Sequence, residues 1–391
     1  MKLSRQIRNI VGSGSDGWDL FRRARALIAA GEPVVELTIG EHDIRTDPVI
    51  LEAMERSARG GHTGYASIPG IPALRQAVAA RIAARTGVAT TADNILITAG
   101  GQFGLFTAHN AVCDPGDRAL FIDPYYATYP GTIRTAGAIP VAVTALAEHG
   151  FQPQEAALDA AAPGARSLLI NSPNNPTGAV YDLATMQGIA RVCQRHDLWL
   201  ISDEVYDSQV WQGDFISPRA LPDMAERTMV VGSLSKSHAM TGSRIGWICA
   251  PEHTIRPMLD LATHSNYGIP GFVQDAALAA LALPPEFEAA VAEPFRRRRD
   301  IAARLVAGQN VVRAAPMQGA MYALLDIRAT GLTGEGFADA LLDEERIAVM
   351  PGESFGAAAG GHVRVALTVE DTQLEDALTR LLAFAAARAA G

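Results

Sequence analysis

The middle of the chain alternates short apolar runs with longer amphipathic runs, and this alternation limits the folds that the chain can adopt. Between residues 94 and 249 it predicts strands at 95–98, 119–122, 167–170, 198–202, 228–231 and 244–249. Runs of helical spacing, residues 103–112 and 183–196, lie between some of these strands. Strands that alternate with helices form a mostly parallel sheet with helices on both faces, so we expect an α/β fold.

The flanking residues predict a second, smaller domain. A chain of 391 residues is long for one hydrophobic core. Before residue 94 the pattern predicts a strand at 33–40 and helices at 18–30, 48–59 and 71–85. After Pro284 it predicts a long charged helix, residues 286–306, and strands at 322–327, 347–350 and 362–366. We expect a large domain over residues 46–285 and a smaller α+β domain formed by residues 1–45, with an N-terminal arm, and 286–391.

Composition and charge exclude several partners. The net charge of −9 argues against a nucleic acid or an anionic membrane as a partner. No apolar stretch approaches the length of a membrane span, and the first residues lack the apolar region of a secretory signal. Cys113, Cys193 and Cys249 are widely spaced without a CxxC motif, which is typical of reduced core residues. We therefore expect a cytoplasmic protein, and no metal site is predicted.

The basic run at residues 296–299 is the strongest local charge cluster. Acidic residues flank it on both sides within a helical pattern. The sequence therefore predicts a solvated helix face here.

A polar cluster follows each of five predicted strands, at the point where the strand ends. In an open α/β sheet, ligands bind outside the carboxyl ends of the strands. We therefore expect the five clusters to face one crevice; they are residues 99–102, 123–126, 171–178, 203–206 and 233–236.

Lys236 lies in the last of these clusters and is an unusual residue in this chain. Of the 33 lysines and arginines only two are lysines, and the other, Lys2, lies at the N-terminus. Arginine serves wherever only a surface cation is needed, but a lysine amine can lose its proton and attack a carbonyl. We infer that Lys236 is retained for such chemistry, although it could be a chance survivor on the surface.

A lysine in such a crevice can form a Schiff base with the aldehyde of pyridoxal phosphate. This cofactor also needs an anion at its ring nitrogen, a cradle for its phosphate and a surface against its ring. Asp203 ends a buried strand and could supply the anion, although an aspartate there could equally cap a helix.

The other two requirements also have candidate residues. Gly100, Gly101 and Gln102 open a helix whose N-terminus could bind phosphate, although Gly-Gly turns are common. Ser233 and Arg244 could add a hydroxyl group and a guanidinium group. Three further residues could contact the ring, by stacking or by hydrogen bonds to its 3-oxygen, although tyrosines after strands are often simply half-buried: Tyr126 for stacking, and Asn175 and Tyr206 for the 3-oxygen.

Residues 12–17 match the dinucleotide-binding pattern G-x-G-x-x-G, with Glu36 about twenty residues further on. That pattern binds a nicotinamide cofactor only where a buried strand precedes the first glycine. Residues 5–11 are too polar for a central parallel strand, so we interpret them as a flexible arm.

Over nearly its whole length the chain resembles the class I/II pyridoxal-phosphate aminotransferases of the aspartate aminotransferase superfamily. The motifs that carry the resemblance fall in the family's order: Gly40-Glu41, Gly64-Tyr65, Asn171 to Gly178, Ser202 to Tyr206, Ser233-x-Ser-Lys236, Met240 to Arg244 and His362-Val-Arg364. The resemblance implies fold type I, with a mixed, mostly parallel sheet between helices in the large domain. It also implies a homodimer with shared active sites.

The resemblance implies a role for each site residue. Lys236 would be the Schiff-base lysine and proton shuttle, Asp203 would face the ring nitrogen, and Asn175 and Tyr206 would face the 3-oxygen. The phosphate would be held by Gly101, Gln102, Ser233 and Arg244, joined by Tyr65 from the partner subunit. The substrate α-carboxylate would bind Arg364, with Asn175 and the backbone of Gly40.

The substrate is the least determined feature. Residues 235–242, 327–332 and 351–356 resemble the arginine–pyruvate transaminases of the family. Departures from the family's pattern, His42 for proline, Arg45 for an acid and Ser243 for tryptophan, fall near the expected pocket. Trp18 is the predicted pocket wall, unless it only packs in a helix core.

The charges near this pocket point in two directions. Asp16, Glu41 and Asp43 could bind a cationic side chain, whereas Arg45 could attract a dicarboxylate. We expect a long or basic amino acid as donor and pyruvate as acceptor. The alternatives are a β-lyase or cyclase on the same fold, a nicotinamide-dependent dehydrogenase that uses residues 12–17, and a non-catalytic sensor domain.

Overall fold

A large mixed sheet forms the centre of the protein. The computed structural model describes residues 1–11 and 18–390. Within them, seven strands follow the order β2 (Ile95–Thr98), β8 (Gly246–Cys249), β7 (Thr228–Ser233), β6 (Trp199–Asp203), β5 (Ala165–Asn171), β3 (Arg118–Asp123) and β4 (Ile139–Thr144). Strand β8 alone runs against the others, pairing antiparallel with β2 and β7. The predicted mostly parallel sheet is therefore correct, and the carboxyl ends of the other strands meet at one edge.

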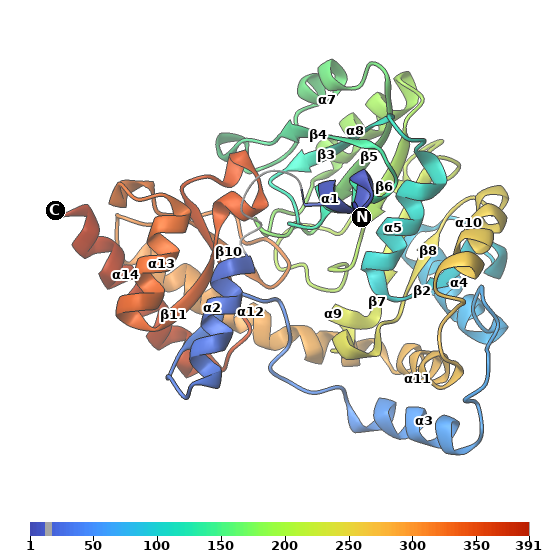
Figure 1. Cartoon of the computed structure of the whole chain (residues 1–391), viewed down its shortest axis with the longest axis horizontal. Helices are drawn as coiled ribbons and strands as arrows, with labels where there is room; N and C mark the ends of the chain where they lie inside the picture. Colours follow the sequence, from blue (N-terminus) through green and yellow to red (C-terminus); the bar gives the residue numbers. More distant parts are fainter. Residues whose placement is uncertain (12–17, 391) are drawn as a thin grey trace.

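Helices cover both faces of this sheet because its central strands are apolar on both sides (Figure 1). In β5, Leu169 packs with one set of helices, whereas Leu168 and Ile170 pack with the other. One face bears α5 (Gly100–Val112), α6 (Tyr129–Thr135) and α10 (Glu252–Ser265). The other bears α4 (Pro72–Thr86), α7 (Glu155–Ala161), α8 (Leu183–Arg195) and α11 (Gly271–Leu281), with α3 (Pro48–Arg59) packed outside α11.

A smaller sheet lies beside the large one. Its strands follow the order β1 (Val35–Leu37), β11 (Ile347–Pro351), β12 (His362–Ala366), β10 (Tyr322–Asp326) and β9 (Arg313–Ala314). Strand β1 pairs parallel with β11, so the segment before residue 46 joins the C-terminal third of the chain. Around this sheet pack α2 (Trp18–Ala29), α13 (Gly334–Glu345) and α14 (Asp371–Ala389).

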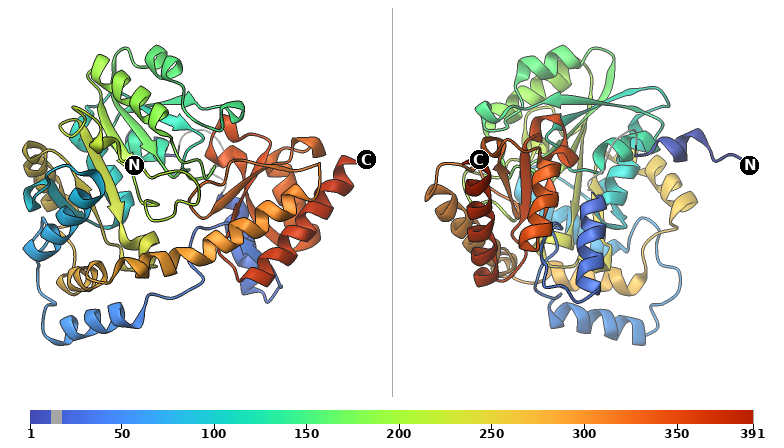
Figure 2. Two further views of the ribbon diagram at one scale, coloured as in Figure 1. Left: turned by 180° about the vertical axis from the view of Figure 1, so that it is seen from behind. Right: turned by 60° about the vertical axis from the view of Figure 1, so that its left-hand side comes forward.

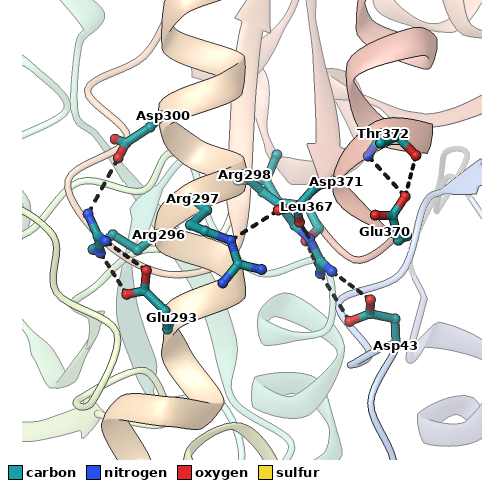
Figure 3. A network of polar contacts seen from close by, with 10 residues as sticks. All are labelled: Asp43, Glu293, Arg296, Arg297, Arg298, Asp300, Leu367, Glu370, Asp371 and Thr372. Atoms are coloured by element: carbon teal, nitrogen blue, oxygen red, sulfur yellow. Dashed lines mark hydrogen bonds and ion pairs between the residues drawn. The ribbon is translucent and has the colours of Figure 1, made fainter.

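Helix α12 (Pro285–Ala307) connects the two sheets, and it spans the distance between them in Figure 2. Its basic run is not the solvated face that the sequence predicted. Arg296 is exposed, but Arg298 is only 3% exposed and pairs with Asp43 and Asp371 (Figure 3). The prediction was wrong for Arg298 because these two carboxylates come from segments distant in sequence.

The segment predicted as an N-terminal arm contains a short helix and contacts α6. Residues Arg5–Asn9 form a short helix, α1, and no strand. Arg134 of α6 donates hydrogen bonds to the carbonyl oxygens of Ile10 and Val11 and so holds the end of this segment. The G-x-G-x-x-G run, residues 12–17, lies outside the described residues. Every helix among the described residues is too short or too polar to span a lipid bilayer.

Candidate active site

A cavity of about 280 Å³ lies where the carboxyl ends of the large sheet meet the smaller sheet. Twelve of the fourteen site residues predicted from the sequence line it; they are Trp18, Gly40, Gly101, Gln102, Tyr126, Asn175, Asp203, Tyr206, Ser233, Lys236, Arg244 and Arg364. Gly100, which precedes the lining residue Gly101, and Tyr65 do not line it. The polar clusters that follow the strands therefore do converge on one crevice.

Lys236 enters the cavity from α9 (Leu234–Ser237), the short helix after β7. Ser233 caps this helix, its hydroxyl accepting a hydrogen bond from the backbone N–H of Ser235. The amine of Lys236 donates to the carbonyl oxygen of Gly40. Burial, together with the cations Arg364 and Arg244, lowers the pKa of Lys236 to about 8 against the opposing effect of Glu41. An amine with this pKa can act as a nucleophile near neutral pH.

Asp203 lies at the end of β6 and does not cap a helix, since residues 205–208 form a turn. The hydroxyl of Tyr129 donates to Oδ2 of Asp203 over 2.7 Å, while the backbone N–H of Val205 lies 3.4 Å from Oδ1. Burial raises the pKa of Asp203 to about 6, and the Tyr129 bond opposes that rise. A buried carboxylate without a cation partner is costly, so a protonated ring nitrogen suits this position.

Arg364 presents its guanidinium group between two aromatic rings. It lies 4.5 Å from the centroid of Tyr322 and 4.4 Å from that of Phe355. Nη1 donates to Oδ1 of Asn175 over 3.0 Å, and Nη2 donates to the carbonyl oxygen of Thr38. Nε is buried and has no hydrogen-bond partner among the described residues. A donor of this kind fits the carboxylate of a substrate.

Tyr206 is oriented by a partner from the smaller sheet. Its hydroxyl oxygen lies 2.8 Å from that of Tyr322. The hydroxyl of Tyr322 also lies so close to Gly40 that a Cβ atom there would be 1.9 Å from it. Gly40 thus admits a close approach that no other residue allows.

The N-terminus of α5 and Arg244 border the other end of the cavity. Gly100 has φ of +74°, and a Cβ atom there would lie 2.5 Å from Nη2 of Arg244. The side chain of Gln102 is held by α6, donating to Thr132 over 2.7 Å and accepting from Thr128 over 2.9 Å. Because the cap residue of α5, Ala99, makes no side-chain hydrogen bond to this first turn, the backbone N–H groups of the turn are available to bind an anion.

These features fit pyridoxal phosphate. The cavity holds a lysine amine of lowered pKa, a buried carboxylate that pairs with no cation among the described residues, and a helix N-terminus beside a guanidinium group. Tyr126 lines the same cavity, with its ring centroid 5.8 Å from that of Tyr129. Each requirement of the cofactor thus has a residue in place.

A larger cavity of about 900 Å³ adjoins the first and shares Trp18, Gln102, Ala127 and Arg244 with it. Trp18 therefore stands between the two cavities, with its ring edge against Phe21 at 5.5 Å. Glu335 and Glu353 are among the residues that line the outer cavity.

Several charges that were considered for substrate binding lie elsewhere or outside the described residues. Asp43 is occupied by Arg298, which binds both of its carboxylate oxygens. Arg45 is exposed and lines neither cavity, and Asp16 lies outside the described residues. Glu41 does line the inner cavity.

Tyr65 is 92% exposed and lines neither cavity of its own chain. Its ring centroid lies 5.1 Å from that of Tyr267, which is 52% exposed. Two such tyrosines side by side on a surface form an apolar patch with hydroxyl groups, as is common in protein interfaces.

The sequence did not reveal three residues of the site, Tyr129, Tyr322 and Phe355. Tyr129 lies on α6, and the other two come from the smaller sheet and the loop after β11. None of them directly follows a strand of the large sheet, which was the signal used. A tyrosine within an apolar run, as at Tyr322, could have indicated a buried hydroxyl group that needs a partner.

Comparisons with known proteins agree with this geometry. The pattern of the aminotransferase class I and II family matches residues 32–381. An arginine–pyruvate transaminase of Pseudomonas aeruginosa, AruH, is 40% identical over 388 residues, which cover 99% of this chain and 98% of the relative. An aspartate/prephenate aminotransferase of Thermus thermophilus is 37% identical over 365 residues, covering 92% of each chain. The structure of Thermus thermophilus aspartate aminotransferase with maleate is similar with a TM-score of 0.91 and 34% identity, over 97% of this chain and 100% of that one.

Proposed function

Because the chain belongs to the family of class I and II aminotransferases, we propose that it moves the amino group of a long or basic L-amino acid to pyruvate. The protein is a pyridoxal-phosphate-dependent aminotransferase of fold type I. We assign the amine of Lys236 as the reacting group because it is buried and belongs to the one internal lysine of the sequence. The donor class, the residue roles and the assembly are the parts that we propose.

We assign each residue by the atoms that it presents. When bound, pyridoxal phosphate supplies an aldehyde that holds the amino group and a ring that accepts electrons from the substrate Cα. The amine of Lys236 would bind that aldehyde until the substrate displaces it, and would then carry the Cα proton. Asp203 would keep the ring nitrogen protonated, with Tyr206 and Asn175 at the 3-oxygen and Tyr126 against the ring.

The remaining residues would bind and orient. The first turn of α5 (Gly100, Gly101, Gln102), Ser233 and Arg244 would hold phosphate through N–H, hydroxyl and guanidinium groups. Arg364 would bind the substrate α-carboxylate through its Nε atom, which has no partner in the described part of the chain, beside Asn175 and Gly40. Since the first keto acid would leave before the second one binds, with the amino group held at the cofactor site in between, we expect ping-pong kinetics.

The space around Trp18 supports an amino acid with a long side chain as the donor. A long side chain can extend past Trp18 into the outer cavity, where Glu335 and Glu353 place carboxylates. Oε1 of Glu353 already accepts from the backbone N–H groups of Gly334 and Gly361, so Glu335 is the more available of the two. A relative's name, arginine–pyruvate transaminase, supports the same donor and acceptor.

A donor screen with pyruvate, reading the alanine formed, tests this proposal. We expect arginine, lysine and methionine to exceed aspartate and glutamate. Glu335→Gln should lower kcat/KM for arginine about threefold, a modest effect because Glu335 is exposed, and leave methionine unchanged. Methionine is thus the control within the variant. Preference for aspartate or glutamate would contradict the proposal and direct attention to Arg45.

We further propose a cytoplasmic homodimer in which Tyr65 of each subunit reaches the partner's phosphate. The exposed pair of Tyr65 and Tyr267 supports the interface. Three buried cysteines without disulfides suit a reducing compartment. We take residues 46–285 as the large domain and residues 1–45 with 286–391 as the smaller one, in line with the two sheets.

A further inference from the structure

His42, which has no role in the chemistry above, contacts the backbone of the reacting lysine. Its Nε2 atom lies 2.9 Å from the carbonyl oxygen of Lys236. Because a carbonyl oxygen only accepts, Nε2 carries the proton and donates it. Helix α9 has four residues, so its carbonyl groups need partners from outside the helix. We find no other hydrogen bond to the carbonyl of Lys236 among the described residues.

The environment of His42 keeps its ring neutral. The residue is 9% exposed, and its ring packs edge-on against Phe295 with centroids 5.1 Å apart. Nδ1 is buried without a partner in the described part of the chain. Burial and then the charge of Lys236 lower the pKa of His42 to about 4, while Asp43 opposes and Arg298 adds to this effect. His42 is therefore a neutral donor near pH 7 and cannot carry the substrate proton itself.

His42 belongs to a segment, residues 38–46, that also contacts residues 236–241, here called the lysine loop, at three other points. The amine of Lys236 donates to Gly40. The hydroxyl of Thr241 donates to Glu41 over 3.1 Å. The hydroxyl of Thr46 donates to the carbonyl of Ala239 over 2.6 Å. Hydrogen bonds therefore connect the 38–46 segment to the lysine loop at several positions along both.

The opposite side of this segment is fixed to the smaller sheet and to α12. Arg364 donates to the carbonyl of Thr38, and Thr368 donates to that of Ile39 over 3.2 Å. Arg298 donates two hydrogen bonds, of 2.6 and 3.0 Å, to the carboxylate of Asp43 (Figure 3). The segment is thereby held independently of the lysine, so it can serve as a fixed reference for it.

We propose that His42 is a positioning residue for Lys236, whose hydrogen bond fixes the lysine backbone to the 38–46 segment. With its backbone held, Lys236 moves its amine by side-chain rotation alone. Proton transfer depends steeply on such placement, since an error of about 1 Å can cost roughly 100-fold in rate. Loss of the bond should therefore slow proton transfer more than it weakens substrate binding.

Two substitutions separate the hydrogen bond from the packing of the ring. His42→Phe keeps a ring against Phe295 but removes the donor, whereas His42→Gln keeps an N–H donor of similar reach. His253→Phe, at an exposed histidine of α10, is the matched control. Single-turnover rates are measured with L-arginine and with its Cα-deuterated form, or with L-aspartate if the donor screen favours it.

We expect His42→Phe to lower the maximal rate about tenfold, with the half-saturating donor concentration changed less than twofold. The deuterium isotope effect should increase, because proton transfer then limits the rate more fully. His42→Gln should recover most of the rate, and His253→Phe should match the parent. If His42→Phe retains the parent rate, or if His42→Gln is as slow as His42→Phe, the proposal is wrong.

A second readout uses the cofactor-free chain and does not depend on activity. Reductive methylation at a series of pH values, followed by mass spectrometry, reports Lys236, with Lys2 as an internal standard. The charged groups that act on Lys236 are Glu41, Arg364 and Arg244. In His42→Phe the released amine becomes better hydrated, so the midpoint of Lys236 modification should move to higher pH while Lys2 is unchanged. An unmoved midpoint in a folded variant would overturn the positioning role.

Discussion

Tyr129 and Asp203 form the residue-scale contact on which the proposed ring chemistry depends most directly. Tyr129 is 2% exposed, and its hydroxyl group donates to the Asp203 carboxylate over 2.7 Å. This bond favours the ionised form of Asp203, whereas burial raises its pKa to about 6. An ionised Asp203 is what a protonated ring nitrogen requires.

Tyr129→Phe removes this bond and leaves burial in place, so the pKa of Asp203 should rise. More of Asp203 is then protonated at any acidic pH, and the acid limb of the kcat/KM profile should move upward by roughly one pH unit. The rate at pH 8.5 should stay near that of the parent. The pH–rate profile from 5 to 9 checks this, with the nearby Tyr125→Phe as control; an unshifted acid limb would show that Tyr129 only packs.

At the same scale, the site was predictable where chemistry and position coincided. Asp203 ends strand β6 and Lys236 lies three residues after strand β7, and both are of a residue type that is costly to bury without a purpose. Tyr322 lies in an apolar run, where a tyrosine is interpreted as a core residue, and Tyr129 lies in a mixed segment, between Thr128 and Pro130, that shows no site pattern. Their hydroxyl groups gain a role only from partners brought together by the fold.

At the scale of elements, the strands buried on both faces were predicted well, whereas the exposed edge strand β4 was not predicted. Strands β2, β6 and β7 are continuous apolar runs and lie within two residues of the predicted bounds. Strand β4 was missed because it is an edge strand with exposed residues and a proline. Helix α5 begins at Gly100, three residues before the predicted start at residue 103. The prediction began late because the first turn contains glycines, which have poor helix propensity.

Helix α12 depends on contacts that no local pattern reveals. Glu288 in its first turn pairs with Arg81 and Arg85 of α4, and Arg298 near its middle pairs with Asp43 and Asp371. These ion pairs attach the start of α12 to α4, which packs on the large sheet, and the middle of α12 to the 38–46 segment. The basic run looked solvated because its partners are distant in sequence.

Arg298→Met should therefore be destabilising. It removes a guanidinium group that is 3% exposed, but its partner carboxylates are partly exposed and can be hydrated. We expect a loss of about 2 kcal/mol, which lowers the melting midpoint by roughly 2–3 °C in a chain of this length. Arg296→Met, at an exposed pair, should change stability by less than about 0.5 kcal/mol. Equal melting midpoints for the two variants would contradict this reading of the buried pair.

At the scale of the whole molecule, one residue of the predicted site, Tyr65, lies apart from the others. Lys236 and Asp203 line the same cavity of one chain, whereas Tyr65 is exposed and lines neither cavity. If Tyr65 acts at the phosphate, it must come from a second copy. A closed dimer with twofold symmetry would give each site one such tyrosine. Sedimentation at assay concentration should then show a dimer.

Mixing two defective variants tests the shared site directly. A dimer of Lys236→Ala with Tyr65→Ala contains one site with an intact Lys236 from one subunit and an intact Tyr65 from the other. Random reassociation at equal amounts makes half of the dimers hybrids, so the mixture should recover about a quarter of the parent activity. Lys236→Ala mixed with Asp203→Asn should recover none, because both residues belong to the same chain's cavity. Recovery in both mixtures, or in neither, would show that Tyr65 does not cross to the partner, since only a shared site separates the two outcomes.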